Sequence, residues 1–396
     1  MKFIHTADLH LDSPFSGLTE VSPELWERIY QSTFVAFERI VDAAINNQVD
    51  FMLIIGDIYD RDHHSAKAED FFIRQCQRLE EAEIHVYLSY GNHDYQVVDD
   101  NKYLPENVHV FSNQGETKRL TLPDGKSIAI TGFSYGQRWL SNNQTALYPN
   151  KGQEDWHIGM LHGAVQKNNP NQDHYAPFTI QDLIEKHYDY WALGHIHSHQ
   201  ILSSEPPIVY CGDPQGRNKN EGGQHGFYLV QDHNGTLVPQ FNPIADIEWG
   251  MVPAIASKEI SSSSSLIDFL IQTVGKNEQF KMIQFNLHSQ NLAPIVIQQV
   301  NSGATLEQLQ SQIEQEGRIN WWPYQIKIID QEEMPTMTNL DEQYWKKAAS
   351  EVFRTEELVE KAGKLANYDF INQALEDSGT IDELQSMALK KLGLGK

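Results

Sequence analysis

The stretch "IHVYLSYGNHD", residues 84–94, joins an apolar run to a glycine, an amide, an imidazole and a carboxylate. The apolar part is typical of a buried strand, and Gly, Asn and Asp are usual in the turn after a strand. Turn chemistry does not account for His93, because histidine is not a favoured turn residue. The histidine therefore indicates that this strand end has a chemical role, and that role predicts partners elsewhere in the chain.

Other predicted strand ends carry the same kinds of side chain. They are Asp8 and His10 after residues 2–7, Asp57 at the end of 50–57, Asn92 after 84–90, His162 in "WHIGMLH", and His195 and His197 in "GHIH". In open α/β sheets, ligands collect at the carboxyl ends of the strands. Side chains two residues apart in an extended segment point the same way. Asp8 and His10 could therefore face one ion, as could His195 and His197.

The first half of the chain alternates apolar runs with helical patterns. Apolar residues recur at helical spacing over 25–45, after Ser22 and Pro23, and again over 71–79. This βαβαβ order predicts a buried, mostly parallel sheet covered by helices. From about residue 190 the strand-like runs come closer together, which favours antiparallel additions.

The pattern changes near residue 245. The apolar runs predict strands at 249–256, 280–287 and 322–329, with helices at 264–274 and 304–315. Beyond this segment the sequence is charged and helical. We therefore expect a catalytic domain at 1–244, a small α/β capping domain at 245–335, and a helical tail at 336–396 that packs back onto the capping domain or docks a partner.

The composition bounds the class of protein. The chain has 396 residues, 40% of them hydrophobic, and two cysteines, too few for a disulfide framework or a zinc ribbon. Residues 1–10 do not show the pattern of a signal peptide, and no apolar run is long enough for a membrane span, so we expect a soluble protein of the cytoplasm that does not contact a membrane. The net charge of −24, without a basic stripe, disfavours DNA binding by the chain alone.

The polar strand ends resemble the signature blocks of the calcineurin-like metallophosphoesterases. Those blocks are D-x-H, G-D-x-x-D, G-N-H-D/E, a single His and G-H-x-H, and here they span residues 8–197. The resemblance implies an α/β sandwich of mixed sheets flanked by helices. It also implies two metal ions with Asp57 as a bridging ligand. The implied ligands are Asp8, His10, Asp57 and His197 for one ion, and Asp57, Asn92, His162 and His195 for the other.

Imidazole, carboxylate and amide ligands without thiolate suit Mn²⁺, Fe²⁺ or Zn²⁺ better than Ca²⁺. We expect Mn²⁺, and Mg²⁺ stays open. In this scheme His93 binds no ion and is left to meet the phosphate or protonate the leaving oxygen. We expect Asp94 to orient its ring, and Asp60 to have a supporting role outside the ligand set.

A narrower resemblance is to the SbcD/YhaO-type DNA-repair exonuclease subunits. It rests on "FIHTADLHLDSPF" (3–15), "GDIYDR" (56–61), "GNHD" and "VYCGDPQGR" (209–217). It implies a DNA exonuclease, a homodimer formed through helices of the catalytic domain, and docking of the tail on an SMC-like ATPase of the SbcC/YhaN type.

Two alternatives stay open. A cyclic-nucleotide or other small-molecule phosphodiesterase needs the same metal site, and a non-catalytic scaffold subunit of an ATPase complex needs none. The glycine-rich loop at 211–223 is a further ambiguity. Its Arg217 and Lys219 could meet a substrate phosphate, or the loop could only turn the chain.

Overall fold

The computed structural model describes residues 1–13, 21–60, 65–95, 103–166, 175–275, 279–317 and 320–329, with short pieces between 348 and 388. The chain divides into two compact units. The first comprises Met1–Val252, Ile267–Phe285 and Gly303–Ile326, and the second comprises Pro253–Leu266, Asn286–Ser302 and Lys327–Lys396. All the polar strand ends lie in the first unit, which is the part described most fully below.

The first sheet of this unit has six strands in the order β12-β11-β1-β2-β3-β4. Strands β1 to β4 are parallel, and the hairpin of β11 and β12 adds to β1 in the antiparallel sense. The strands are β1 (Lys2–Ala7), β2 (Phe51–Ile55), β3 (His85–Ser89), β4 (Val108–Val110), β11 (Gly226–His233) and β12 (Thr236–Pro243).

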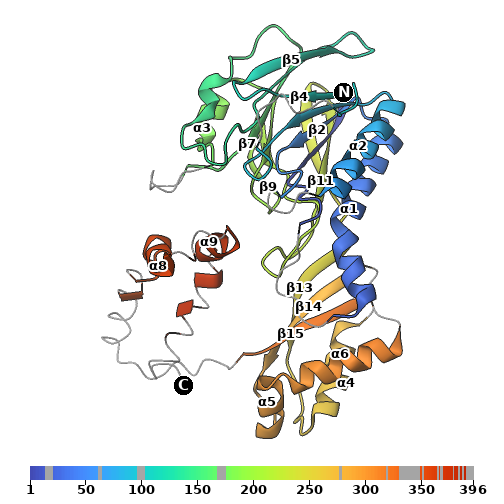
Figure 1. Ribbon diagram of the computed structural model, residues 1–396, viewed down its shortest axis with the longest axis vertical. Coiled ribbons are helices and arrows are strands. Elements are labelled where there is room, and N and C mark those ends of the chain that lie inside the picture. The colour runs from blue at the N-terminus through green and yellow to red at the C-terminus, as the bar shows by residue number, and fades with distance from the viewer. Residues whose placement is uncertain are drawn as a thin grey trace. The chain divides into compact units, whose positions relative to one another are not determined.

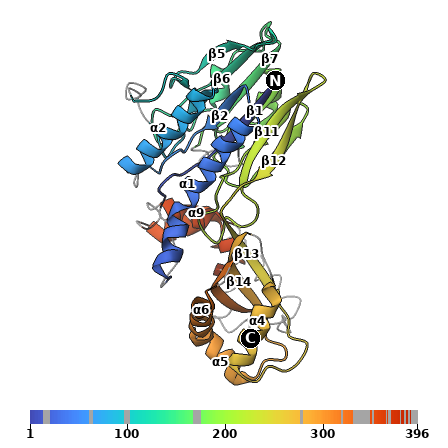
Figure 2. The same cartoon turned by 90° about the vertical axis from the view of Figure 1, so that its right-hand side faces the viewer.

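Two amphipathic helices run side by side along this sheet (Figures 1 and 2). They are α1 (Pro23–Asn46) and α2 (Ala66–Glu81). Each begins at a serine whose hydroxyl accepts a backbone N–H three residues on, and Pro23 occupies the first turn of α1. Their buried faces, with Phe37 and Phe72 stacked at 5.6 Å, pack against the strands, so the predicted βαβαβ unit is confirmed.

The second sheet also has six strands, in the order β5-β6-β7-β8-β10-β9. Its centre is parallel, and β5 and β9 are antiparallel edges. The strands are β5 (Glu116–Thr121), β6 (Ser127–Gly132), β7 (Trp156–His162), β8 (Tyr190–Gly194), β9 (Gln200–Ser204) and β10 (Pro207–Tyr210). A 3-10 helix at Gln144–Leu147 and the short helix α3 (Ile180–Ile184) accompany this sheet. The antiparallel additions expected after residue 190 are therefore present at β9, β11 and β12, whereas β10 pairs in parallel with β8.

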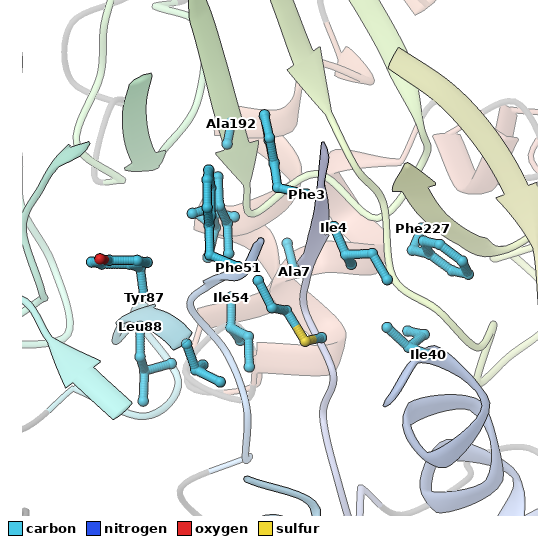
Figure 3. Close-up of a cluster of buried hydrophobic side chains, with 14 of the residues drawn as sticks. Phe3, Ile4, Ala7, Ile40, Phe51, Ile54, Tyr87, Leu88, Ala192 and Phe227 are labelled. Carbon is cyan, nitrogen blue, oxygen red and sulfur yellow. The ribbon is translucent and has the colours of Figure 1, made fainter. Parts of the chain in front are cut away.

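The core of the unit lies between the two sheets. Phe3 of β1 stacks on Phe51 at 4.9 Å and meets the edge of Tyr190, from β8, at 5.5 Å. Figure 3 shows part of this core, with Phe3 and Phe51 from the first sheet and Ala192 from the second. Two mixed sheets face each other with helices outside, so the predicted sandwich is confirmed.

A third sheet, β13-β14-β15, follows the sandwich in the sequence. Its elements are β13 (Ile247–Ala254), α4 (Ser263–Val274), β14 (Phe280–His288), α5 (Pro294–Asn301), α6 (Ala304–Glu316) and β15 (Trp321–Ile329). The strands and helices predicted here are present, and α5 is an element that the sequence pattern missed. Two further helices, α8 (Thr355–Ala362) and α9 (Asp369–Glu376), lie within the expected tail, most of which falls outside the described residues. The domain boundaries at 244 and 335 stay predictions.

Candidate metal centre

The polar residues predicted from the strand ends meet at the carboxyl edges of both sheets. The first sheet supplies the residues after β1, β2 and β3, and the second supplies the end of β7 and the residues after β8. Asp8, His10, Asp57, Asn92 and His162 are at most 3% exposed. A cluster of ionisable side chains with so little exposure requires charge compensation from within.

Asp8, His10 and His197 form the first group. A donor atom from each lies within 4.8 Å of the other two. Both ring nitrogens of His10 are buried and have no hydrogen-bond partner among the described residues. Burial and the nearby Arg217 guanidinium hold the pKa of His10 well below its usual value, so the ring is neutral. An unpartnered neutral imidazole is the form that binds a metal ion.

Asp57, His162 and His195 form the second group, again within 4.8 Å of one another. Asn92 belongs with them, because its Oδ1 lies 3.0 Å from Nε2 of His162 and 3.1 Å from Nδ1 of His195. Nδ1 of His162 lies 3.0 Å from the carbonyl oxygen of Ile55, which can only accept a hydrogen bond. Nε2 of a neutral His162 is therefore a lone-pair atom, and it faces the oxygens of Asn92 and Asp57.

The oxygens of Asn92 and Asp57 and the Nε2 lone pair of His162 face one another, so this group needs a positive charge at its centre. Burial alone would lower the pKa of His162, but the carboxylates of Asp57 and Asp8 raise it to about 9. In the protein without metal, a proton on His162 meets this need. A divalent cation meets it better, since it satisfies several lone pairs at once. The residues present therefore fit a metal ion at both groups.

Asp57 lies between the two groups. Its Oδ2 is 3.3 Å from Nε2 of His162 and 3.9 Å from Nε2 of His10. Its Oδ1 accepts the backbone N–H of His93 at 2.9 Å. One carboxylate that reaches both groups has the geometry of a bridging ligand.

His93 lies beside the centre, with its ring 5.2 Å from the ring of His10. Its Nδ1 is 3.6 Å from Oδ1 of Asp60. Asp94 does not orient the His93 ring as expected. Its two oxygens accept the backbone N–H groups of Gly91, Asp57 and Ile58 at 2.7, 3.2 and 2.6 Å. The carboxylate that faces the ring is therefore Asp60, and Asp94 ties the turn after β3 to the turn after β2.

The backbone at the strand ends is not extended. Asp8, His10, Asp57 and His195 have φ values of 52°, 43°, 51° and 96°. Alternation along an extended segment therefore does not determine where these side chains point. The ligand sets that the resemblance implies already place His195 and His197 on different ions. Asp8 and His10 do fall in one group, but His195 and His197 fall in different ones. Non-glycine residues at positive φ cluster at functional sites, where surrounding contacts hold them.

Two glycines make room for the centre. A Cβ on Gly91 would lie 2.2 Å from Oδ1 of Asp57, and one on Gly56, where φ is +71°, would lie 2.4 Å from Nδ1 of His162. Neither position accepts a side chain without displacing a residue of the second group.

The loop at 211–223 brings charged residues to the first group that the sequence left unassigned. Arg217 and Glu221 form a partly buried ion pair beside His197, and Asp213 pairs with His225. Possible ligand atoms of His197, Asp213 and Glu221 also lie within 4.8 Å of one another. The two carboxylates of this third group are already compensated, because Glu221 pairs with Arg217 and Asp213 pairs with His225. Glu221 carries no signal in the sequence beyond being an acid in a glycine-rich loop.

A family profile described as calcineurin-like phosphoesterase matches residues 1–199. The chain is 37% identical over 346 residues to the uncharacterized metallophosphoesterase YhaO of Bacillus subtilis (strain 168), covering 86% of this chain and 84% of that protein. It is 23% identical over 276 residues to the DNA double-strand break repair protein Mre11 of Methanopyrus kandleri, covering 63% of this chain and 57% of that one. It is 23% identical over 306 residues to SbcD, a component of the nuclease SbcCD of Escherichia coli (strain K12), covering 65% of this chain and 74% of that one.

Within the described parts of the chain, none of the helices combines the length and apolar character needed to cross a membrane.

Proposed function

The chain belongs to the calcineurin-like phosphoesterase family, and we propose that it hydrolyses the phosphodiester bonds of DNA as an exonuclease in DNA repair. The observation that carries this proposal is how much of the chain is similar in sequence to Mre11 and to SbcD. Those alignments cover 63% and 65% of this chain, whereas residues 1–199, which the family profile matches, are about half of it. The likeness therefore extends past the metal centre that every family member needs.

We assign two divalent metal ions, Mn²⁺ first among them, to the two groups of the centre. The ligands are those of the sequence scheme, with Asp57 shared. Ions held there would draw charge from a phosphodiester and stabilise the leaving oxygen. The mixed nitrogen and oxygen ligands, without thiolate, support this choice.

His93 is the proposed general acid. Its Nδ1 is directed to Asp60, which leaves Nε2 for the substrate. In hydrolysis a water oxygen would bond to phosphorus as the P–O bond to the leaving oxygen breaks, and a proton held at Nε2 would pass to that leaving oxygen. Asp60 would fix the angle of the ring.

The test is hydrolysis with Mn²⁺ on three substrates: an end-labelled DNA duplex, a cyclic nucleotide and bis(p-nitrophenyl) phosphate. We expect nucleotides to be released from the DNA end. Cleavage of the small substrates with intact DNA would instead identify a small-molecule phosphodiesterase. A protein that cleaves none of the three would favour the scaffold role, which needs no metal site.

We further propose that the chain works as a homodimer with an SMC-like ATPase of the SbcC/YhaN type. The net charge of −24 supports the need for a partner with a DNA-binding surface. The predicted docking tail contains large apolar side chains. Among them, Val352 and Leu365 are 45% and 56% exposed, and Tyr344 and Trp345 lie outside the described residues. Exposed apolar side chains beyond the last sheet support docking on a partner.

Deletion of residues 340–396 tests the docking. We expect the truncated protein to cleave a short oligonucleotide at the full-length rate and to lose co-purification with the ATPase. Retention of the ATPase would move the docking site elsewhere. Light scattering on the full chain tests the dimer.

A further inference from the structure

The loop at 211–223 holds a partly buried ion pair behind His197. Nη2 of Arg217 donates to Oε1 of Glu221 at 3.0 Å, and the backbone N–H of Arg217 donates to Oε2 at 2.6 Å. Both side chains are 11% exposed. Bound to a guanidinium and a backbone amide, Glu221 is an anion, and an ionised carboxylate only accepts hydrogen bonds.

The Glu221 carboxylate determines which ring nitrogen of His197 carries the proton. Nδ1 of His197 lies 2.9 Å from Oε1 of Glu221, so Nδ1 is the donor. Nη2 of Arg217 is 3.1 Å from the same Nδ1, but both are donors and share the Glu221 oxygen. In the neutral ring, Nε2 is then the lone-pair atom.

The loop is anchored before any ion binds. Gln215 donates to the carbonyl oxygen of Ile247 at 2.7 Å and accepts its N–H at 3.1 Å. The indole of Trp249 donates to the carbonyl oxygen of Gly216 at 3.0 Å. Nε2 of His225 lies 3.0 Å from the carbonyl oxygen of Glu221 itself. The carboxylate is therefore set in place by the first strand of the third sheet and by His225.

We propose that Glu221 is a positioning residue that fixes the tautomer and ring angle of His197, so that Nε2 faces the ion shared with Asp8 and His10. The inference rests on the proposed metal centre and deepens it. A carboxylate behind a metal-binding histidine typically changes metal affinity by about 10- to 100-fold. Because Glu221 serves His197 of the first group, its loss should affect one ion and spare the other.

The experiment is a calorimetric titration of MnCl₂ into the metal-stripped full-length protein, with no substrate present. We expect E221Q to weaken one of two Mn²⁺ binding events by about 10- to 100-fold and to leave the other unchanged. E154Q is the matched control, because Glu154 pairs with Arg119 at 2.9 Å in a different part of the sandwich. E154Q should bind Mn²⁺ as the wild type does.

A double-mutant cycle with H197A separates positioning from general stability. In the H197A background, E221Q should have no further effect on Mn²⁺ affinity. Wild-type binding by E221Q, or an equal loss in both backgrounds, would overturn the proposal. If E221Q does not fold, E221D replaces it, because the shorter side chain withdraws the carboxylate from Nδ1 of His197: weakening of the same single event supports the proposal, and wild-type binding refutes it. Because no DNA is used, a failure of the proposed nuclease activity leaves this test intact.

Discussion

Oδ2 of Asp57 lies 3.9 Å from Nε2 of His10, an imidazole whose two nitrogens are buried without a hydrogen-bond partner among the described residues. Unpartnered buried nitrogens are costly, and a protein retains them where another group satisfies them. The same Oδ2 is 3.3 Å from Nε2 of His162 in the second group. The two halves of the centre therefore depend on one carboxylate.

This dependence predicts the effect of Asp57→Ala. The variant should lose both metal ions and all hydrolysis, because the bridge contributes to both groups. His10→Ala should deplete mainly one ion, since His10 belongs to the first group only. Elemental analysis of the purified variants gives the metal content. Two full equivalents in Asp57→Ala would refute the bridge.

His93→Ala should separate catalysis from metal binding. We expect the metal content to stay near wild type while the rate falls by about 10²- to 10⁴-fold, the usual contribution of a general acid. Asp60→Asn should give a smaller loss of rate, since it removes only the carboxylate facing the ring. Metal analysis and initial rates are measured on the same preparations. Loss of metal from His93→Ala would make His93 a ligand.

Gly91→Ala should damage the centre without changing any ligand. The added Cβ would overlap Oδ1 of Asp57, the same oxygen that accepts the backbone N–H of His93. We expect a lower metal content and a lower melting temperature. Gly250→Ala is the control, because a Cβ there meets no atom within 4 Å. Equal metal content in the two variants would contradict the packing argument.

Mn²⁺ binding should release protons. In the metal-free protein the pKa of His162 is raised to about 9, so the ring is protonated near neutral pH and the ion must displace that proton. Affinity should therefore fall as the pH falls below this pKa. Calorimetry in two buffers of different ionisation enthalpy measures the released protons. An apparent enthalpy that is identical in both buffers would contradict this prediction.

His5 should make the metal-free fold less stable in mild acid. Burial between the sheets lowers its pKa from 6.5 to about 3, and the carbonyl oxygen of Leu193 beside Nε2 only partly opposes this shift. The unfolded chain binds the proton below pH 6.5 and the folded chain does not. The free energy of unfolding should thus drop by up to about 1.4 kcal/mol per pH unit between pH 6.5 and about pH 3.

Urea unfolding of the wild type and of His5→Gln, at several pH values from neutral to mildly acidic, checks this prediction. The variant is expected to be less stable at neutral pH, so the slopes against pH are compared rather than the absolute values. The slope should be shallower in His5→Gln. Parallel slopes would mean that His5 is protonated equally in the two states.

Several features of the fold and centre follow from local sequence. Apolar runs such as residues 51–55 form buried strands wherever they lie in the chain, and helical spacing after Ser22 produces α1. Polar residues at the ends of parallel strands meet because those strands share one direction. These are short-range signals, so the sandwich and the main residues of the centre could be predicted from them.

Contacts between distant residues decided the remainder. Left-handed backbone at Asp8 and His10 is imposed by hydrogen bonds from their N–H groups to Gly56 and Asp57, far away in sequence, so the extended interpretation of this segment was wrong. Likewise Asp60, not Asp94, faces His93, because Asp94 is engaged by three backbone N–H groups. Glu221 meets His197 only after two sheets and a loop have packed. Local sequence determines which side chains lie at the carboxyl edge of a sheet. Their hydrogen-bond and ion-pair partners depend on burial, which is a property of the whole fold.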